Sequence, residues 1–233
     1  MPIPTNNHPQ SAAGNAQQAT AIFGSAYMGN VRYYAAMLAM RDNNILIDSN
    51  EKIGKHSWMH NHCRIMGANG IQLLTVPVEH VDTKCNGIVM RDLQISEHGD
   101  WRRIHWGAIF SAYGKTPFFE YIADDLASIY QRRDKWLIDF NMSLHNLIVD
   151  FLDLPVNARS AQVQSTPTGA TDWRNRIGIK KNDNIDSIVD IPYYNIWNTK
   201  HGFTPGLSII DLLMNCGRES VFTLLKMLNH SLI

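Results

Sequence analysis

The sequence has few cysteines and no excess charge of either sign. Its three cysteines, Cys63, Cys85 and Cys216, are odd in number and scattered, which fits neither a disulfide framework nor the C-x-x-C pairs of a zinc site. The 21 basic residues balance the 21 acidic ones, so no net field attracts the chain to nucleic acid or to an anionic membrane. We therefore expect reduced thiols and no nucleic-acid partner.

Long apolar runs and several common enzyme motifs are also absent. No stretch approaches the roughly 20 apolar residues of a membrane span, and residues 1–20 contain neither the basic nor the apolar region of a signal peptide. The G-x-S-x-G, P-loop and G-x-G-x-x-G patterns are missing, which argues against the familiar hydrolase, NTPase and dinucleotide-binding classes. We expect a cytoplasmic protein without a membrane span.

The chain divides into a polar head and one globular domain. Residues 1–19 are rich in Asn, Gln, Ala and Pro, a composition typical of disorder, whereas 20–233 are long enough to bury one core. Hydrophobic patterns predict a strand over 21–27, a helix over 31–40 and a strand over 45–48, which form a βαβ unit. Its first turn would lie at the carboxyl end of a parallel strand, where ligands usually bind. We expect an α/β fold with a mixed, largely parallel sheet flanked by helices.

The remaining elements follow from turn and capping signals. Residues 51–70 are polar and end in the turn pair Asn69-Gly70, which predicts a functional loop or hairpin. Asp100 and Ser208 are placed to cap helices. The other predicted elements are strands over 72–78 and 93–95, helices that start near 101, 118, 136, 208 and 219, and a strand with a long surface loop within 154–184.

Polar and aromatic side chains are densest over nine residues, where seven carry a polar or aromatic tip: His56, Trp58, His60, Asn61, His62, Cys63 and Arg64. Imidazoles offer acid/base chemistry near neutral pH, and an arginine can bind a carboxylate or phosphate through two hydrogen bonds. A substrate pocket, a solvated hairpin and a thiol nucleophile at Cys63 all stay open. No H-E-x-x-H or C-x-x-C pattern completes a metal site, so we predict none.

Two later segments carry further candidates. The helix from residue 101 places Trp101 and His105 on one face, and such a histidine is either a catalyst or a structural core residue. Residues 200–211 join a basic, glycine-containing loop to a helix amino terminus, which is either an anion site or simply a capped helix. Asp211 lies on an otherwise apolar helix and needs a partner if it is buried.

Three blocks in this order resemble the WbqC-like protein family. They are Asn61-His62-Cys63-Arg64-Ile65 with Ala68-Asn69-Gly70, then Trp101, His105-Trp106 and Ala112-Tyr113-Gly114-Lys115, and finally Lys200-His201-Gly202-Phe203 with Ser208-Ile209-Ile210-Asp211. With Tyr33-Tyr34, the blocks extend over nearly everything from Ala21 to the end.

The resemblance implies an enzyme of bacterial surface-polysaccharide (O-antigen type) biosynthesis. It would transfer a glycyl, other aminoacyl or acyl group from a donor to the amine of a nucleotide-linked amino sugar. Such amide formation needs a base, donors for the tetrahedral oxyanion and cations for the diphosphate. We assign the base to His105, the oxyanion donors to Asn61 and Asn69, and the cations to Lys115 and Arg64. The other expected substrate-binding residues are His62, Trp106, Tyr113, His201 and Asp211.

This sequence departs from the family pattern around residues 59–62, where the segment Met59-His60 is also longer than usual, and at the first turn. His62 stands where the family has arginine, so anion binding would pass to Arg64 or be lost. The first turn carries Met28-Gly29-Asn30 in place of a proline. A changed substrate is one consequence, and a non-catalytic protein that binds a sugar nucleotide or acts as a scaffold in the same pathway is the alternative. The donor, any cofactor and the oligomeric state stay unknown, and an oligomer is possible.

Overall fold

The computed structural model describes residues 19–54, 58–79, 87–177 and 187–228. The head predicted to be disordered lies outside this range, apart from Ala19. The prediction of an α/β fold with a largely parallel sheet is confirmed, because a four-stranded parallel sheet is accompanied by a two-stranded antiparallel hairpin and by helices.

The parallel sheet has the strand order β5-β2-β1-β6. Its strands are β1 (Thr20–Phe23), β2 (Asn44–Asp48), β5 (Ala158–Ala161) and β6 (Thr171–Asp172). Every neighbouring pair is parallel, so the carboxyl ends of all four strands lie at one edge. The segments that follow these strands therefore meet there, although they are far apart in the sequence.

The predicted βαβ unit is confirmed. Helix α1 (Val31–Ala39) connects β1 to β2, which pair in parallel with Ala21 opposite Ile45. Asn30 caps α1 because its side-chain oxygen accepts a hydrogen bond from the Tyr33 amide at 2.9 Å. The apolar residues of α1 are buried, so the helix is held by packing as well as by its cap.

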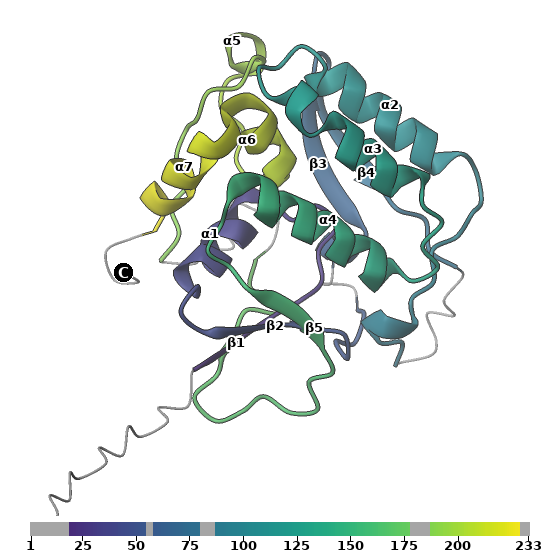
Figure 1. Cartoon of the computed structure of the whole chain (residues 1–233), viewed down its shortest axis with the longest axis vertical. Helices are drawn as coiled ribbons and strands as arrows, with labels where there is room; N and C mark the ends of the chain where they lie inside the picture. The colour runs from purple at the N-terminus through teal and green to yellow at the C-terminus, as the bar shows by residue number, and fades with distance from the viewer. Residues whose placement is uncertain (1–18, 55–57, 80–86, 178–186, 229–233) are drawn as a thin grey trace, which may run out of the picture.

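The other helices surround the sheet and the hairpin, which consists of β3 (His62–Gly67) and β4 (Gly70–Thr75). Figure 1 shows α1 and α4 next to the sheet, α2 beside the hairpin with α3 packed on α2, and α6 and α7 next to α1. The α-helices are α2 (Trp101–Tyr113), α3 (Ala123–Gln131), α4 (Leu137–Leu152), α5 (Asn198–His201), α6 (Ile209–Cys216) and α7 (Ser220–Lys226). Short 3-10 helices are η1 (Trp58–His60), η2 (Met90–Asp92), η3 (Phe119–Tyr121) and η4 (Gly217–Glu219).

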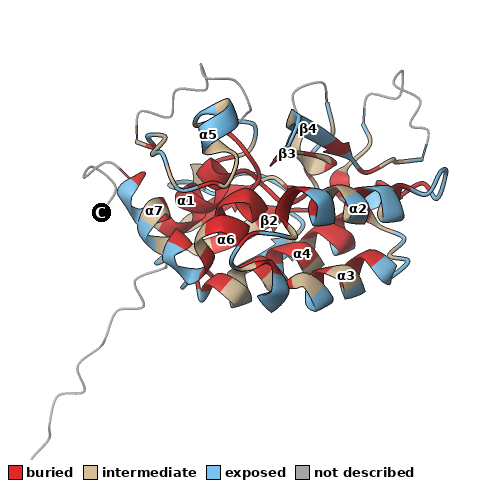
Figure 2. Cartoon of the chain, turned by 90° about the horizontal axis from the view of Figure 1, so that it is seen from above, coloured by how far each residue is buried: buried red, intermediate tan, exposed pale blue. Residues whose placement is uncertain are grey.

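One continuous apolar core holds these layers together. Figure 2 shows buried residues along α1, α4 and α6, and exposed residues on the outer faces of α2 and α3. Within the described part of the chain, no helix combines the length and the apolar character that a membrane crossing needs.

Several local predictions differ from the structure. Within residues 93–95, Gln94 and Ile95 form isolated bridges with Trp136 and Val78 in place of a strand. The segment from Phe118 begins with η3, and the α-helix starts only at Ala123. Asp100 precedes α2 but makes no capping hydrogen bond, because its carboxylate pairs with Arg103. Ser208 does cap α6, where its Oγ accepts from the Ile210 amide.

Candidate functional site

Polar residues gather where the parallel strands end. Gly24 and Ser25 follow β1, Asp48 ends β2, and Asp172 ends β6. In open α/β sheets, ligands bind at this edge because the loops there diverge and leave a crevice. The carboxyl edge of the sheet is therefore where a binding site is expected from the topology.

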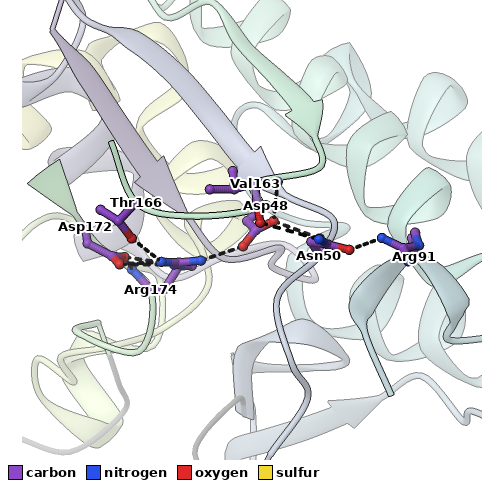
Figure 3. Close-up of polar contacts among 7 residues, drawn as sticks. All are labelled: Asp48, Asn50, Arg91, Val163, Thr166, Asp172 and Arg174. Carbon is purple, nitrogen blue, oxygen red and sulfur yellow. Dashed lines mark hydrogen bonds and ion pairs between the residues drawn. The ribbon is translucent and has the colours of Figure 1, made fainter. Parts of the chain in front are cut away.

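Asp48 is the centre of a hydrogen-bond network at this edge (Figure 3). The residue is 1% exposed. Its Oδ1 accepts from the amides of Asn50 at 2.8 Å and Val163 at 3.1 Å, and its Oδ2 accepts from Arg174 Nη1 at 2.6 Å. Arg174 also donates to Asp172 Oδ2 at 2.6 Å. These bonds connect the segments that follow β2, β5 and β6.

Further bonds extend the network on both sides (Figure 3). Arg174 Nη2 donates to Thr166 Oγ1 at 2.9 Å, and Arg91 donates to Asn50 Oδ1. Burial alone would raise the pKa of Asp172, but the hydrogen bonds from Arg174 bring that pKa below its ordinary value. The neighbouring carboxylates likewise raise the pKa of Arg174. The pair is thus charged at neutral pH and holds the edge in one geometry.

Glu51 stands next to this network without an ion pair of its own among the described residues. Its side chain is buried, with 8% of the residue exposed, and the pKa is raised from 4.5 to about 7. Burial is the largest cause, the charge of Asp48 adds to it, and Arg174 opposes it. A carboxyl group with a pKa near 7 can accept or give a proton at neutral pH.

Gly24 leaves the space that this carboxyl group occupies. A Cβ at position 24 would lie 2.5 Å from Glu51 Oε2, which is closer than real Cβ atoms approach another heavy atom. Any side chain at position 24 would therefore move the Glu51 carboxyl group. The absence of a side chain at Gly24 is what allows Glu51 to reach the end of the sheet.

Glu51 is part of the wall of two adjoining hollows. The inner pocket has a volume of about 30 Å³, room for about two water molecules. It is lined by Gly24, Ser25, Tyr33, Glu51, Trp58, Met59, His60, Trp173, Asn175 and Ile177. Burial lowers the pKa of His60 to about 4, so this imidazole is neutral at pH 7. The inner pocket is thus negative whenever Glu51 is ionised.

The outer groove has a volume of about 500 Å³, which falls within the range of small-molecule sites. It is lined by Asp48, Asn50, Glu51, Lys52, Val89, Val163, Gln164, Asp172, Arg174 and Asn175. Glu51 and Asn175 line both hollows, so the two are adjacent. The basic side chains Lys52 and Arg174 balance Asp48 and Asp172, so the groove is neutral when Glu51 is protonated and negative when it is ionised.

Hydrogen bonds and an aromatic stack hold the wall residues of the inner pocket in position. Asn141 on α4 donates through Nδ2 to Ser25 Oγ at 3.0 Å and to the His60 carbonyl at 2.8 Å. Tyr33 donates its hydroxyl to the Gly24 carbonyl at 2.8 Å. Trp173 stacks on Phe23 with ring centroids 5.9 Å apart. The ends of β1 and η1 are therefore held at fixed positions relative to Glu51.

Part of the polar segment 56–64, which the sequence analysis identified as a candidate, lies at this site. Trp58 and His60 line the inner pocket, and His62 stacks on Trp58 with ring centroids 5.2 Å apart. Asn61 instead donates to the Val76 carbonyl at 3.0 Å and holds the hairpin. His56 lies outside the described residues.

Cys63 does not have the properties of a thiol nucleophile. It is 3% exposed, and burial raises the pKa of its thiol well above the ordinary value. Cys63 and Cys216 are both free thiols, while Cys85 lies outside the described residues.

His105 is packed in the core beneath α2. It is 4% exposed, its Nδ1 is 2.8 Å from the Tyr27 hydroxyl, and its ring meets Trp101 at 5.2 Å. Burial lowers the pKa of His105 to about 4. It lines neither the inner pocket nor the outer groove, and its role as the base stays a prediction.

Two other predicted residues meet in a buried network. Tyr113 donates to Asp211 Oδ1 at 2.7 Å, and Asp211 also accepts from Tyr193 at 2.8 Å and from Asn195 at 2.6 Å. Asp211 is fully buried, and burial raises the pKa of its carboxyl group despite these bonds. Asp211 was expected to need a partner if buried, and Tyr113, Tyr193 and Asn195 all donate a hydrogen bond to its carboxyl group.

The remaining predicted residues lie elsewhere on the surface or on the hairpin. Asn69 is exposed in the hairpin turn and Lys115 is exposed after α2. Arg64 is half-buried on β3. His201 Nε2 contacts the Ala68 carbonyl at 3.1 Å, and Trp106 stacks on Phe119 at 6.0 Å.

Sequence reasoning missed most of the carboxyl-edge site. Asp48 was placed at the end of a strand but not considered as a site residue, and Glu51 was treated as part of a polar loop. Asp172 and Arg174 fall in a segment expected to be mainly surface loop. The available signal was the rule that ligands bind at the carboxyl ends of parallel strands, applied to every strand and not only to the first.

Comparison with known proteins places the chain in a family. No solved structure matches it. The uncharacterized protein Rv1507c of Mycobacterium tuberculosis is 26% identical over 216 residues, which cover 81% of this chain and 90% of that protein. The sequence model of the WbqC-like protein family matches residues 26–186, a range that contains Glu51, Asp172 and Arg174. This chain therefore belongs to the WbqC-like protein family.

Proposed function

We propose that this protein is a transferase that attaches a glycyl, other aminoacyl or acyl group to the amine of a nucleotide-linked amino sugar in bacterial surface-polysaccharide biosynthesis. The observation that carries the proposal is the carboxyl group of Glu51, which is buried at the carboxyl edge of a parallel sheet with a pKa of about 7. A nucleotide-linked acceptor also implies a reaction in the cytoplasm.

The charge and size of the inner pocket support an amine as the reacting group. The pocket holds about two water molecules, so it can take the end of a ligand but not a whole sugar. Glu51 is its ionised group, because His60 is neutral at pH 7. An ammonium group would replace water and gain a charge-assisted hydrogen bond with the Glu51 carboxylate.

The chemistry follows from that contact. The Glu51 carboxylate takes a proton from the ammonium, and the freed nitrogen lone pair attacks the carbonyl carbon of the acyl donor. A C–N bond forms, and the bond from the acyl carbon to the leaving group breaks with its electron pair on the leaving group, which takes up the second proton that the nitrogen loses. We assign the developing oxyanion to the Ser25 hydroxyl, because its oxygen already accepts from Asn141 Nδ2 and its hydrogen can point to the ligand.

The outer groove would hold the rest of the acceptor. Its volume of about 500 Å³ suits a sugar with its nucleotide. Trp58 provides a partly exposed aromatic face in the wall of the inner pocket. Lys52 is an exposed cation on the groove, which we assign to the diphosphate. This set differs from the sequence-based assignment of His105, Lys115 and Arg64.

The test is a transfer assay with mass-spectrometric detection of the acylated product. Purified protein is given nucleotide-linked amino sugars with aminoacyl or acyl donors, and the wild type is compared with Glu51→Gln. Removing the base should lower turnover by about 100-fold or more. The matched control is Glu120→Gln, an exposed carboxylate on η3, which should act as the wild type does.

Two results would overturn the proposal in different ways. Wild-type turnover in Glu51→Gln would remove Glu51 as the base and return His105 to consideration. Tight binding of the amino-sugar nucleotide without product from any donor would favour the alternative of a non-catalytic binding or scaffolding protein.

A further inference from the structure

A second cavity lies between the start of α2 and the end of α3. Its volume is about 540 Å³, and it shares no lining residue with the inner pocket or the outer groove. We call it the arginine pocket, after its basic residues Arg102, Arg103 and Arg133. Trp101, Trp106 and Tyr130 supply aromatic walls.

The arginine pocket has the opposite charge balance to the outer groove. Its three arginines face two carboxylates, Glu97 and Asp100. Glu97 pairs with Arg102 at 2.9 Å, and Asp100 pairs with Arg103. Arg133 is exposed and has no ion-pair partner among the residues that the structure describes. A net positive charge therefore remains in a cavity large enough for a small molecule.

Arg102 is the best-positioned cation of this pocket. Its side chain is 13% exposed, and its guanidinium carbon lies 4.4 Å from the ring centroid of Trp101. This stacking fixes the plane of the guanidinium. Nη2 donates to Glu97, whereas Nε and Nη1 are buried with no acceptor in the described part of the chain. Arg102 thus has one carboxylate partner among the described residues, the half-exposed Glu97, so part of its charge is left to attract an anion in the pocket.

We propose that the arginine pocket binds a nucleotide, with its phosphate on the arginines and its base on the aromatic wall. A phosphate offers several acceptor oxygens and up to two charges, which suits several guanidinium groups better than a single carboxylate does. Trp106 is partly exposed while it stacks on Phe119, so it can pack against a planar ring. This site is separate from the one around Glu51 and does not depend on the proposed transferase activity.

Calorimetric titration of the full chain with uridine monophosphate tests the proposal. We expect Arg102→Gln to weaken binding by about tenfold or more, because it removes a largely buried, stacked charge. Arg102→Lys should recover only part of the affinity, since it restores the charge but not the planar fork. The matched control is Arg159→Gln, an exposed arginine on β5 outside the pocket, which should bind as the wild type does.

A second variant guards against loss of folding at position 102. Arg133 is exposed, so Arg133→Gln should keep the melting temperature of the wild type while it weakens binding and its dependence on salt. Uridine and inorganic phosphate, titrated separately, should each bind more weakly than the nucleotide. Equal affinity for phosphate alone would contradict the stacking of the base.

Three results would overturn the nucleotide site. They are no binding of uridine monophosphate by the wild type, unchanged binding by both Arg102→Gln and Arg133→Gln, and loss of binding in Lys52→Gln alone, because Lys52 is the cation of the outer groove. The last result would place the nucleotide in the outer groove. A failed transfer assay with intact nucleotide binding at Arg102 would overturn the proposed function but leave this site standing.

Discussion

The carboxyl group of Glu51 packs against the bare Cα of Gly24. A Cβ at position 24 would lie 2.5 Å from Oε2 and 3.1 Å from Cδ. Gly24 has no left-handed backbone that would itself require glycine, so the missing side chain matters for the space it leaves. The glycine that follows β1 thus determines the position of the Glu51 carboxyl group, which follows β2.

Gly24→Ala is therefore expected to move the Glu51 carboxyl group while the fold is kept. The atoms in conflict belong to the end of a flexible side chain, which can turn away by rotation about its own bonds. We expect turnover or amine binding to fall by about tenfold or more, since small displacements at a reacting group are costly. The melting temperature should change by only a few degrees.

Gly107→Ala is the matched control for that substitution. Gly107 lies within α2, and a Cβ there meets no atom within 4 Å. Alanine should stabilise the helix by about 0.5–1 kcal/mol and leave activity unchanged. If both glycine variants retained full activity, the contact between positions 24 and 51 would have no functional role.

Glu51 should make the protein less stable as the pH rises. Its pKa is about 7 in the folded chain against an ordinary value of 4.5, so the folded state binds the proton more tightly. The stabilisation is fully present below pH 4.5 and is lost as the pH rises through 7, by roughly 3 kcal/mol in total. Glu51→Gln lacks this charge, so its stability relative to the wild type should increase between pH 4.5 and 7 in denaturant titrations. A pH-independent difference would contradict the raised pKa.

Arg174 is expected to affect both stability and the pKa of Glu51. Arg174→Gln leaves Asp48 as a buried charge without its cation, which should cost about 3 kcal/mol in denaturant unfolding. Because Arg174 lowers the pKa of Glu51, its loss should shift the pH profile of activity upward. Arg159→Gln, which removes an exposed charge, should change the stability by less than about 0.5 kcal/mol. If the pH profile of activity of Arg174→Gln matched that of the wild type, Arg174 would have no influence on the pKa of Glu51.

His105→Gln distinguishes the sequence-based assignment of the base from the one made here. Glutamine can keep a hydrogen bond to the Tyr27 hydroxyl, which is 2.8 Å from His105 Nδ1. With Glu51 as the base, we expect turnover within about threefold of the wild type and a loss of stability of about 1 kcal/mol. A loss of turnover in a well-folded variant would instead support His105 as the catalyst.

The elements with strong local signals could be predicted from the sequence. The βαβ unit follows from apolar spacing and from the turn before Asn30, and the contact between Trp101 and His105 is confirmed by their ring distance of 5.2 Å. Strands β5 and β6 have four and two residues and are only partly buried. Such short, polar strands owe their position to pairing with β2 and β1, and local patterns do not report that pairing.

The candidate site was harder to predict, because its properties arise between distant segments. The raised pKa of Glu51 depends on burial and on the nearby charges of Asp48 and Arg174. Position 174 is more than 100 residues further along the chain. The segment around His62 could be identified because its polar residues are neighbours in the sequence. For Glu51, the sequence alone predicts a solvent-exposed acid.

The most direct test of the account is an NMR titration of the Glu51 side-chain carboxyl carbon, assigned by its absence in Glu51→Gln. We expect a pKa of about 7 in the free protein and a lower pKa when an amino sugar binds, because an ammonium group favours the carboxylate. The same titration with an N-acetylated sugar should show no such decrease. A pKa near 4.5 in the free protein, or the same pKa with and without the amine, would contradict the assignment of Glu51 as the amine-binding base.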